Sequence, residues 1–293
     1  MQRKERKAIL FSAVTYTLMA VLMFLCFYPF YYVFIYSISD PSAAQKGITI
    51  LPKGVTLYNY LRVLKLEGIF RSFLISLFRT VSGTAITVLA CSFFAYLVTK
   101  NMYGRKIIYR FVIITMYLNS GLIPWYLTLK AYHMTNTFWV YIIPSAISAY
   151  YIVLLKTFIE NLPISLEESA KLDGAGYITV FAKIVFPLSK PILATITVFS
   201  AVAQWNNWFD NYILVQSKQL ETLQLMLYNY LNQASQLSQM STSSLQHGAA
   251  ASALTAQSIR MTITMVATLP ILFVYPWMQK YFVKGIMLGA VKG

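Results

Sequence analysis

The chain has 293 residues, of which 58% are hydrophobic and only 11% are charged, and its formal net charge is +15. A soluble domain usually carries about 25% charged residues, so the composition excludes a water-soluble globular protein. Apolar runs long enough for a bilayer-spanning helix recur along the sequence, whereas the short alternating segments of a membrane β-barrel do not appear. These features predict an all-α, polytopic membrane protein with about six transmembrane helices.

The first apolar segment follows MQRKERK, lacks a small-residue cleavage pattern and is therefore predicted to be a retained span. The third is interrupted around Gly121 and Pro124, and a broken helix is tolerated at membrane depth only where protein or a water-filled cavity covers it. We expect one transmembrane domain over residues 1–293. The predicted spans are approximately 8–37, 70–98, 107–131, 137–159, 188–216 and 259–283.

The distribution of basic residues predicts the orientation. With the N-terminus inside, cytoplasmic segments hold fifteen Lys and Arg residues and external loops hold six, while three more lie in or at the outer ends of spans. Basic residues accumulate in cytoplasmic loops, so both termini are expected in the cytoplasm, with external loops at about 38–69 and 217–258. The second of these, rich in Ser, Gln and Ala, indicates no more than a solvated linker. No basic stretch is interleaved with exposed aromatic residues, so we expect no nucleic-acid partner.

Residues 160–190 are expected to face the cytoplasm and hold four of the nine acidic residues. Ser165 and Glu168 fit a capping box, which predicts a helix reaching about Leu172. Gly174 and Gly176 are expected to end this helix, because glycine tolerates the positive φ of a sharp turn.

A second short helix is predicted from about Tyr177 to Val185, stopped by Pro187 and Pro191. Its sequence has an apolar face that must be buried, either against the spans of the protein itself or against a soluble partner. The sequence leaves both alternatives open. This face comprises Ile178, Phe181, Ile184 and Val185.

A family resemblance rests on this interval. The stretch resembles the EAA loop of ATP-binding-cassette (ABC) importer permeases. It reads Glu168-Ser169-Ala170, three residues, Gly174, nine residues, Ile184, one residue, Phe186 and Pro187, and Ser169 and Phe186 depart from the usual Ala and Leu. The surrounding EESAKLDGA and PLSKPIL are similar to the maltose-type carbohydrate uptake permeases. WNNWFDNYIL (205–214) and FVKGIMLGAVKG (282–293) resemble two further family segments. NSGLIPWY (119–126) is similar to the aldouronate and complex-oligosaccharide subgroup of Gram-positive bacteria.

The resemblance implies a permease subunit that passes oligosaccharides across the cytoplasmic membrane of a Gram-positive bacterium. Its implied partners are membrane lipids, a second homologous permease, two ABC ATPase subunits and an extracellular solute-binding lipoprotein. The resemblance also implies that Glu168 pairs with a basic ATPase residue and that Gly174 fits closely against it, although the capping box alone would also explain Glu168. The implied ATPase-coupling residues are Glu167, Glu168, Ser169, Ala170, Asp173, Gly174, Phe181, Ile184 and Pro187.

The sequence predicts no catalytic, metal or cofactor site. It lacks the phosphate-binding loop G-x-x-x-x-G-K-[ST], so ATP and Mg²⁺ are expected on the partner ATPase and the chain is expected not to be an enzyme. His133 and His247 lack ligand spacing. Cys26 and Cys91 both fall in apolar spans and indicate neither a disulfide framework nor a metal site.

A sugar route needs amides for hydroxyl groups and aromatic faces for C–H surfaces. Two stretches combine them, although packing or membrane-interface anchoring is the commoner role of Trp. They are Trp205, Asn206, Asn207 and Trp208 in the fifth span, and Asn119, Trp125 and Tyr126 beside the broken third span.

Arg79 and Asp210 are ionisable residues near spans, where charges are usually paired or functional. The sequence does not show whether they meet, and Arg79 could instead snorkel to the interface. The rival hypothesis, an ion-coupled secondary sugar carrier, would need an acid at mid-membrane, for which Asp210 is the candidate, and no internal repeat supports it. A scaffold or channel would have no use for the predicted helix–turn–helix at 165–186.

Overall fold

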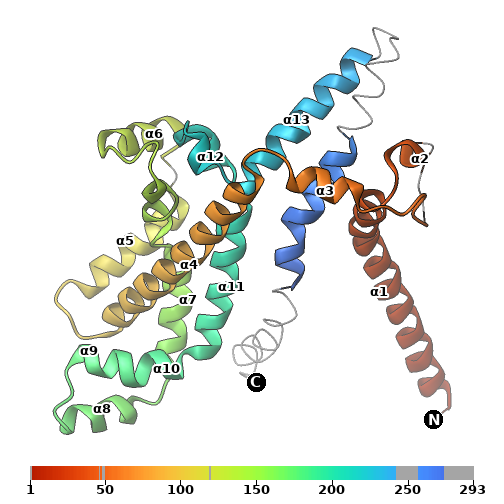
Figure 1. Ribbon diagram of the computed structural model, residues 1–293. Coiled ribbons are helices and arrows are strands. Elements are labelled where there is room, and N and C mark those ends of the chain that lie inside the picture. The colour runs from red at the N-terminus through yellow and green to blue at the C-terminus, as the bar shows by residue number, and fades with distance from the viewer. Residues whose placement is uncertain (1, 46, 48–49, 119, 242–256, 274–293) are drawn as a thin grey trace. The chain divides into compact units, whose positions relative to one another are not determined.

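The computed structural model describes residues 2–45, 47, 50–118, 120–241 and 257–273 (Figure 1). The regular elements in these ranges are helices, with one isolated β-bridge between Ser39 and Val55, which confirms the all-α prediction. The chain divides into two compact units. The first comprises residues 1–69 and 227–269, and the second comprises residues 70–226 and 270–293.

The first unit is built on one long helix. Its helices are α1 (Gln2–Ser37), α2 (Pro41–Gln45), α3 (Tyr58–Leu64) and most of the helix Gln257–Phe273. The end of α1 is fixed by Asn59 of α3, whose Nδ2 donates to the carbonyl oxygens of Ser37 at 3.0 Å and Ser39 at 2.8 Å. Because Asn59 is buried, these bonds also satisfy an amide that would otherwise be costly to bury.

The second unit carries both candidate sites described below. Its elements in order are α4 (Ile69–Thr99), α5 (Arg105–Tyr117), α6 (Leu122–Ala131), η1 (Phe138–Tyr141), η2 (Ile143–Ser145), α7 (Ala149–Glu160), α8 (Ile164–Leu172), α9 (Tyr177–Val180), η3 (Phe181–Val185), α10 (Phe186–Leu188), α11 (Lys190–Asn206), α12 (Phe209–Leu214) and η4 (Lys218–Leu220). α13 (Leu223–Ser241) crosses the sequence boundary between the units.

Breaks divide several of the predicted spans. Among the described residues, two helices are long and apolar enough to cross a membrane, Ile9–Ser37 and Ile69–Thr99, and up to four spans result if each of two bent pairs counts as one. The bent pairs are Phe138–Ser145 with Ala149–Glu160, at 46°, and Tyr177–Leu188 with Lys190–Asn206, at 81°. The predicted span 107–131 is formed by α5 and α6, and Gln257–Phe273 is the described part of the last predicted span.

The predicted span 188–216 is not one helix, which corrects the sequence analysis. α11 ends at Asn206, and α12 begins at Phe209. The side-chain oxygen of Asn207 accepts the backbone N–H of Phe209 at 3.1 Å. Asn side chains compete in this way with the helical hydrogen bonds of the backbone, so the chain turns at Asn207 and Trp208 rather than continuing as a helix.

A buried apolar cluster joins three long helices of the second unit to the loop at 160–190. α4, α7 and α11 contribute Val88, Cys91, Ala95, Tyr96, Ile152, Leu155, Ile159, Leu193 and Ile196, and the loop contributes Val180 and Val185. Closely packed interiors resist deformation. The loop helices are therefore bound to the ends of the long helices as part of one core.

Candidate functional site

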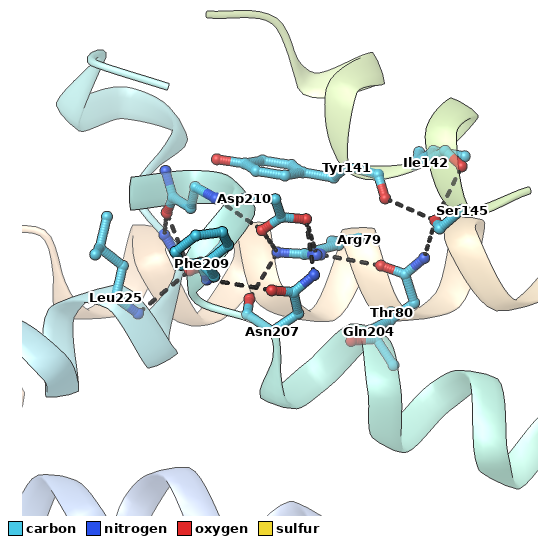
Figure 2. Close-up of polar contacts among 12 residues, drawn as sticks. Arg79, Thr80, Tyr141, Ile142, Ser145, Gln204, Asn207, Phe209, Asp210 and Leu225 are labelled. Atoms are coloured by element: carbon cyan, nitrogen blue, oxygen red, sulfur yellow. Dashed lines mark hydrogen bonds and ion pairs between the residues drawn. The ribbon is translucent and has the colours of Figure 1, made fainter. Parts of the chain in front are cut away.

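A buried ion pair connects α4 to the break between α11 and α12. Arg79 of α4 is 1% exposed, and its Nη1 lies 3.0 Å from Oδ1 of Asp210, while its Nη2 donates to Oδ2 of the same carboxylate (Figure 2). The two residues are 131 positions apart in sequence. Arg79 therefore pairs with Asp210, and the alternative in which it snorkels to the membrane interface is wrong.

The rest of the guanidinium is also bound. Its Nε donates to Oε1 of Gln204 at 3.0 Å, and Nη1 also donates to the carbonyl oxygen of Asn207 at 2.9 Å. The ring of Tyr141 covers the group, with the ring centroid 4.6 Å from the guanidinium carbon (Figure 2). A buried charge is tolerated when it is paired and hydrogen-bonded, and this arrangement meets both conditions.

The same network stabilises the helix break. Carbonyl groups near a helix C-terminus lack intrahelical donors, and Arg79 supplies one to Asn207 directly after α11 ends. Asp210 accepts the Nδ2 of Asn207 at 3.1 Å and the backbone N–H of Asn211 at 2.7 Å. The ion pair thus fixes the backbone and the side chain of Asn207 at the turn.

Two cavities lie beside this network. The larger has a volume of about 500 Å³, and its lining includes Trp125, Tyr141, Ser145, Asn207, Phe209 and Asp210. The smaller has a volume of about 280 Å³, and its lining includes Thr87, Ser145, Ser148, Ser200, Gln204 and Asn207. Ser145 and Asn207 line both, so the two cavities adjoin along these residues.

The structure brings together one residue from each predicted sugar-binding stretch. Trp125 and Asn207 line the larger cavity. Tyr126 packs against the neighbouring apolar cluster of Leu129, Val140 and Leu214. Asn119 lies outside the described residues.

The other predicted route residues line neither cavity. Trp205 is 6% exposed and packs edge-on against Phe73, with ring centroids 6.0 Å apart. Asn206 accepts a hydrogen bond from Gln224 at 3.4 Å, and Trp208 packs edge-on against Phe209 at 5.7 Å between centroids. Tyr141, Ser145, Gln204 and Phe209 were missed as lining residues, although Gln204 adjoins the sequence WNNW and is a polar residue inside an apolar span.

The loop at 160–190 forms the predicted helix, glycine turn and helix, but its capping box is wrong. α8 begins at Ile164 after Pro163, and Ser165 lies inside the helix without a capping hydrogen bond. Pro163 has φ −59°, which suits a helix start, and proline has no N–H that needs a partner there. The proline therefore starts the helix before Ser165 can cap it.

Gly174 ends α8 as predicted. It has φ +82°, the Ala175 N–H donates to the carbonyl oxygen of Ala170 at 2.9 Å, and the Gly174 N–H donates to that of Lys171 at 3.0 Å. These two bonds and the left-handed glycine form a Schellman motif. Gly176 differs from the prediction: its φ is −73°, and it precedes α9 in an extended conformation.

The second loop helix extends past Pro187, which corrects the predicted stop. Helix α9 continues as the π-helical η3 and then as α10, which contains Pro187 and ends at Leu188. The Phe186 N–H bonds back to the carbonyl oxygen of Phe181, five residues earlier, which is the π-helical pattern. In an α-helix the proline ring would clash with the carbonyl group four residues before it, and the wider turn relieves that clash. Pro191 lies in the first turn of α11 and so begins a helix instead of stopping one.

Part of the apolar face of the second helix packs against the spans of the protein itself, as the first alternative predicted, and part of it is exposed, so burial against a soluble partner stays a prediction. Phe181 packs against Phe93 and Tyr96, with centroids 5.3 and 5.4 Å away, and Val185 is buried. Ile184 is half-buried, whereas Ile178 is 72% exposed. Further exposed apolar side chains on the loop are Ile164, Leu172 and Tyr177.

The predicted coupling acids occupy different environments. Glu167 forms an ion pair with Lys100, directly after α4, and Nζ of Lys100 lies 4.3 Å from the ring centroid of Tyr96. Glu168 is exposed and forms no ion pair with any described residue. Ser169 and Asp173 are also exposed, and Ala170 is half-buried against the core. A Cβ added to Gly174 would meet no described atom within 4 Å.

Comparisons with known proteins identify relatives over nearly the whole chain. Residues 88–288 match the family model described as "binding-protein-dependent transport system inner membrane component". The polygalacturonan/rhamnogalacturonan transport system permease protein YtcP of Bacillus subtilis (strain 168) is 35% identical, over 97% of this chain and 99% of the relative. Protein LplC of the same organism is 36% identical, over 90% of this chain and 89% of the relative.

A solved structure has the same fold. It is a chain of a bacterial ABC transporter involved in the import of the acidic polysaccharide alginate, with a TM-score of 0.84 and 28% sequence identity. The superposition covers 94% of this chain and 98% of that chain.

Proposed function

The chain belongs to the family of binding-protein-dependent transport system inner membrane components, and on that premise we propose that it is the oligosaccharide permease subunit of an ABC importer. The observation that carries the proposal is the full-length similarity to a permease named for polygalacturonan and rhamnogalacturonan and to a structure named for alginate import. Both names refer to acidic polymers, so the proposed substrates are oligosaccharides that contain uronic acids.

The larger cavity is the proposed sugar route within this chain. Trp125, Tyr141 and Phe209 contribute aromatic rings, and Ser145 and Asn207 contribute hydrogen-bonding groups. Ligand sites combine apolar walls with a few polar groups in this way. No Lys or Arg occurs among the described lining residues, and Asp210 is neutralised by Arg79. The lining therefore suits hydroxyl groups and ring faces, and recognition of carboxylates is assigned to the solute-binding protein.

The loop at 160–190 is the proposed contact with the ATPase. Glu168 faces outward without a described ionic partner, and the space over Gly174 is open for a close approach. Leu172 is 89% exposed and Ile178 is 72% exposed, so the loop presents apolar surface beside its acid. Phe181 and Val185 tie the loop to the long helices, so a displacement of the loop moves those helices with it. ATP and Mg²⁺ bind to the ATPase in this proposal.

The proposed assembly contains this permease, a second homologous permease and two ABC ATPase subunits in the membrane lipid, with a solute-binding lipoprotein outside. Both termini are cytoplasmic, which the distribution of basic residues supports. A Gram-positive cytoplasmic membrane is the proposed location, and the relatives from Bacillus subtilis support it.

The pairing of Asp210 argues against the rival function. An ion-coupled carrier needs a membrane acid that is free to bind its ion. Both carboxylate oxygens of Asp210 instead accept hydrogen bonds from Arg79. An acid held in this way cannot exchange a coupling ion without breaking a buried ion pair.

Reconstitution tests the proposal. The tagged chain is co-expressed with a homologous permease, an ABC ATPase and a solute-binding protein from the same organism, purified and placed in proteoliposomes. We expect recovery with an ATPase and a second permease, and ATP-driven uptake of galacturonic acid oligosaccharides that exceeds uptake of neutral maltooligosaccharides of equal length. Uptake by the lone chain down an ion gradient, without ATP, would establish the carrier instead.

A further inference from the structure

The amide of Gln204 has a fixed orientation. Gln204 lies in the last turn of α11 and is 5% exposed, and its Oε1 accepts the Nε–H of Arg79. An arginine nitrogen can only donate, so the amide oxygen must face Arg79. The nitrogen Nε2 consequently faces away and donates to Oγ of Ser145 at 2.7 Å (Figure 2).

A glycine makes room for this amide. A Cβ built on Gly83 of α4 would lie 2.7 Å from Nε2 and 2.8 Å from Cδ of Gln204. Real Cβ atoms essentially never approach so closely. Any side chain at position 83 would therefore push the amide out of its place between Arg79 and Ser145, which gives this glycine a role in holding the donor where it is.

The fixed donor belongs to the smaller cavity. Gln204 lines this cavity together with the hydroxyl groups of Thr87, Ser145, Ser148 and Ser200. Its volume of about 280 Å³ is near the lower end of small-molecule pockets, which start at about 300 Å³. Such a space suits one sugar ring rather than a chain, and it adjoins the larger cavity at Ser145 and Asn207.

We propose, on the basis of the proposed function, that Gln204 is a specificity-determining residue that donates from Nε2 to a hydroxyl oxygen of one sugar ring in the smaller cavity. The Ser145 hydroxyl occupies that place in the present structure. When a sugar hydroxyl replaces the Ser145 hydroxyl, Nε2 keeps a hydrogen bond, which avoids the penalty of a buried donor without a partner. In addition, Nε2 carries two hydrogens, and only one hydrogen bond from it to the described residues is found. Arg79 is a positioning residue, because it sets the orientation of the amide.

The test is the concentration dependence of uptake by the reconstituted complex, with galacturonic acid oligosaccharides as the probe. Gln204→Leu keeps a side chain of similar length but removes the donor, and we expect KM to rise about tenfold while kcat changes by less than about twofold. Arg79→Lys keeps the charge but cannot reproduce the planar fork, so the amide is released and KM rises about threefold. The matched control is Gln216→Leu at an exposed position outside both cavities, with unchanged KM.

The outcomes separate this inference from the proposed function. Unchanged KM in Gln204→Leu, or a fall in kcat at constant KM, would overturn the sugar contact while leaving the importer in place. A merely structural role would lower the amount of assembled complex or kcat, without the selective rise in KM. If the wild-type complex imports no oligosaccharide, the proposed function fails and this inference fails with it.

Discussion

The network around Arg79 is buried and hydrogen-bonded, whereas the loop at 160–190 exposes an acid and apolar side chains. Arg79 and Asp210 are buried and bonded to residues of the same chain. On the loop, Glu168 has no described ionic partner, and Leu172 and Ile178 are largely exposed. The charged groups of the first region are paired within this polypeptide, whereas the second region has the composition of a surface that another subunit covers. Loss of a charge in the first region should therefore lower stability, whereas substitution of the exposed loop residues should affect assembly or coupling.

The largest effect on activity is expected on the loop. Glu168→Lys reverses an exposed charge and should leave membrane insertion intact, while ATP-driven uptake falls to background. Gly174→Pro should act in the same way, because proline cannot adopt the φ of +82° found there. Uptake in proteoliposomes and the amount of co-purified ATPase are the measurements. A charge-matched control, Glu67→Lys at another exposed acid, should retain the ATPase. Normal uptake by both loop variants would remove the coupling assignment.

The largest effect on stability is expected at the buried ion pair. Arg79→Met leaves Asp210 buried and uncompensated, which should lower the free energy of unfolding by about 3–5 kcal/mol. Denaturation in detergent, followed by tryptophan fluorescence, measures the change. The double variant Arg79→Met/Asp210→Leu removes both charges and should recover a large part of the loss. If the double variant is as unstable as the single one, burial of an unpaired charge is not the cause.

A smaller loss of stability is expected at the close approach between α4 and α11. Gly83→Ala forces a methyl group against the Gln204 side chain, and overpacking of this kind costs about 1–3 kcal/mol. The same unfolding measurement applies. In a Gln204→Ala background the clashing atoms are gone, so Gly83→Ala should cost much less. Additive losses would show that the glycine serves some other contact.

The smallest effect is expected where the loop is tied to α4. The side chains of Lys100 and Glu167 are 14% and 16% exposed, so their ion pair is only partly screened by solvent. Lys100→Met should lower the free energy of unfolding by about 1 kcal/mol or less. Glu167→Gln should have a similar effect, and the two losses should not add, because either substitution removes the same pair. Loss of ATPase binding by Glu167→Gln without loss of stability would instead place Glu167 on the ATPase contact.

Local features of the loop could be predicted from the sequence. Gly174 marked the end of α8, because a left-handed residue after a helix strongly favours glycine. The capping box was predicted wrongly because Pro163, two residues earlier, begins the helix first. Pro187 was expected to stop a helix, but a π-helical turn accommodates it. In both cases two local rules predict different helix ends, and the sequence alone does not show which of the two applies.

The polar network could be predicted only in part. Ionisable residues near spans are usually paired, and this marked Arg79 and Asp210 as candidates. The two residues are 131 positions apart, and the periodicity within one helix gives no information about contacts between such distant positions. The break at Asn207 had a local sign, since consecutive asparagines interrupt an apolar run, but the run was long enough to suggest one span. Trp205 and Trp208 were predicted to line the sugar route, but the rings of both pack against other aromatic rings.

The helices Tyr177–Leu188 and Lys190–Asn206 meet at a bend of 81°, so a tilt of the first helix would tilt the second if the pair moves as a rigid body. The 17 residues of α11 extend about 25 Å at about 1.5 Å per residue. If a displacement of Tyr177–Leu188 tilts α11 by about 10°, the far end of α11 moves by about 4 Å. That end carries Gln204, so a movement of this size relative to Ser145 would break the bond between them without any change in the length or winding of α11.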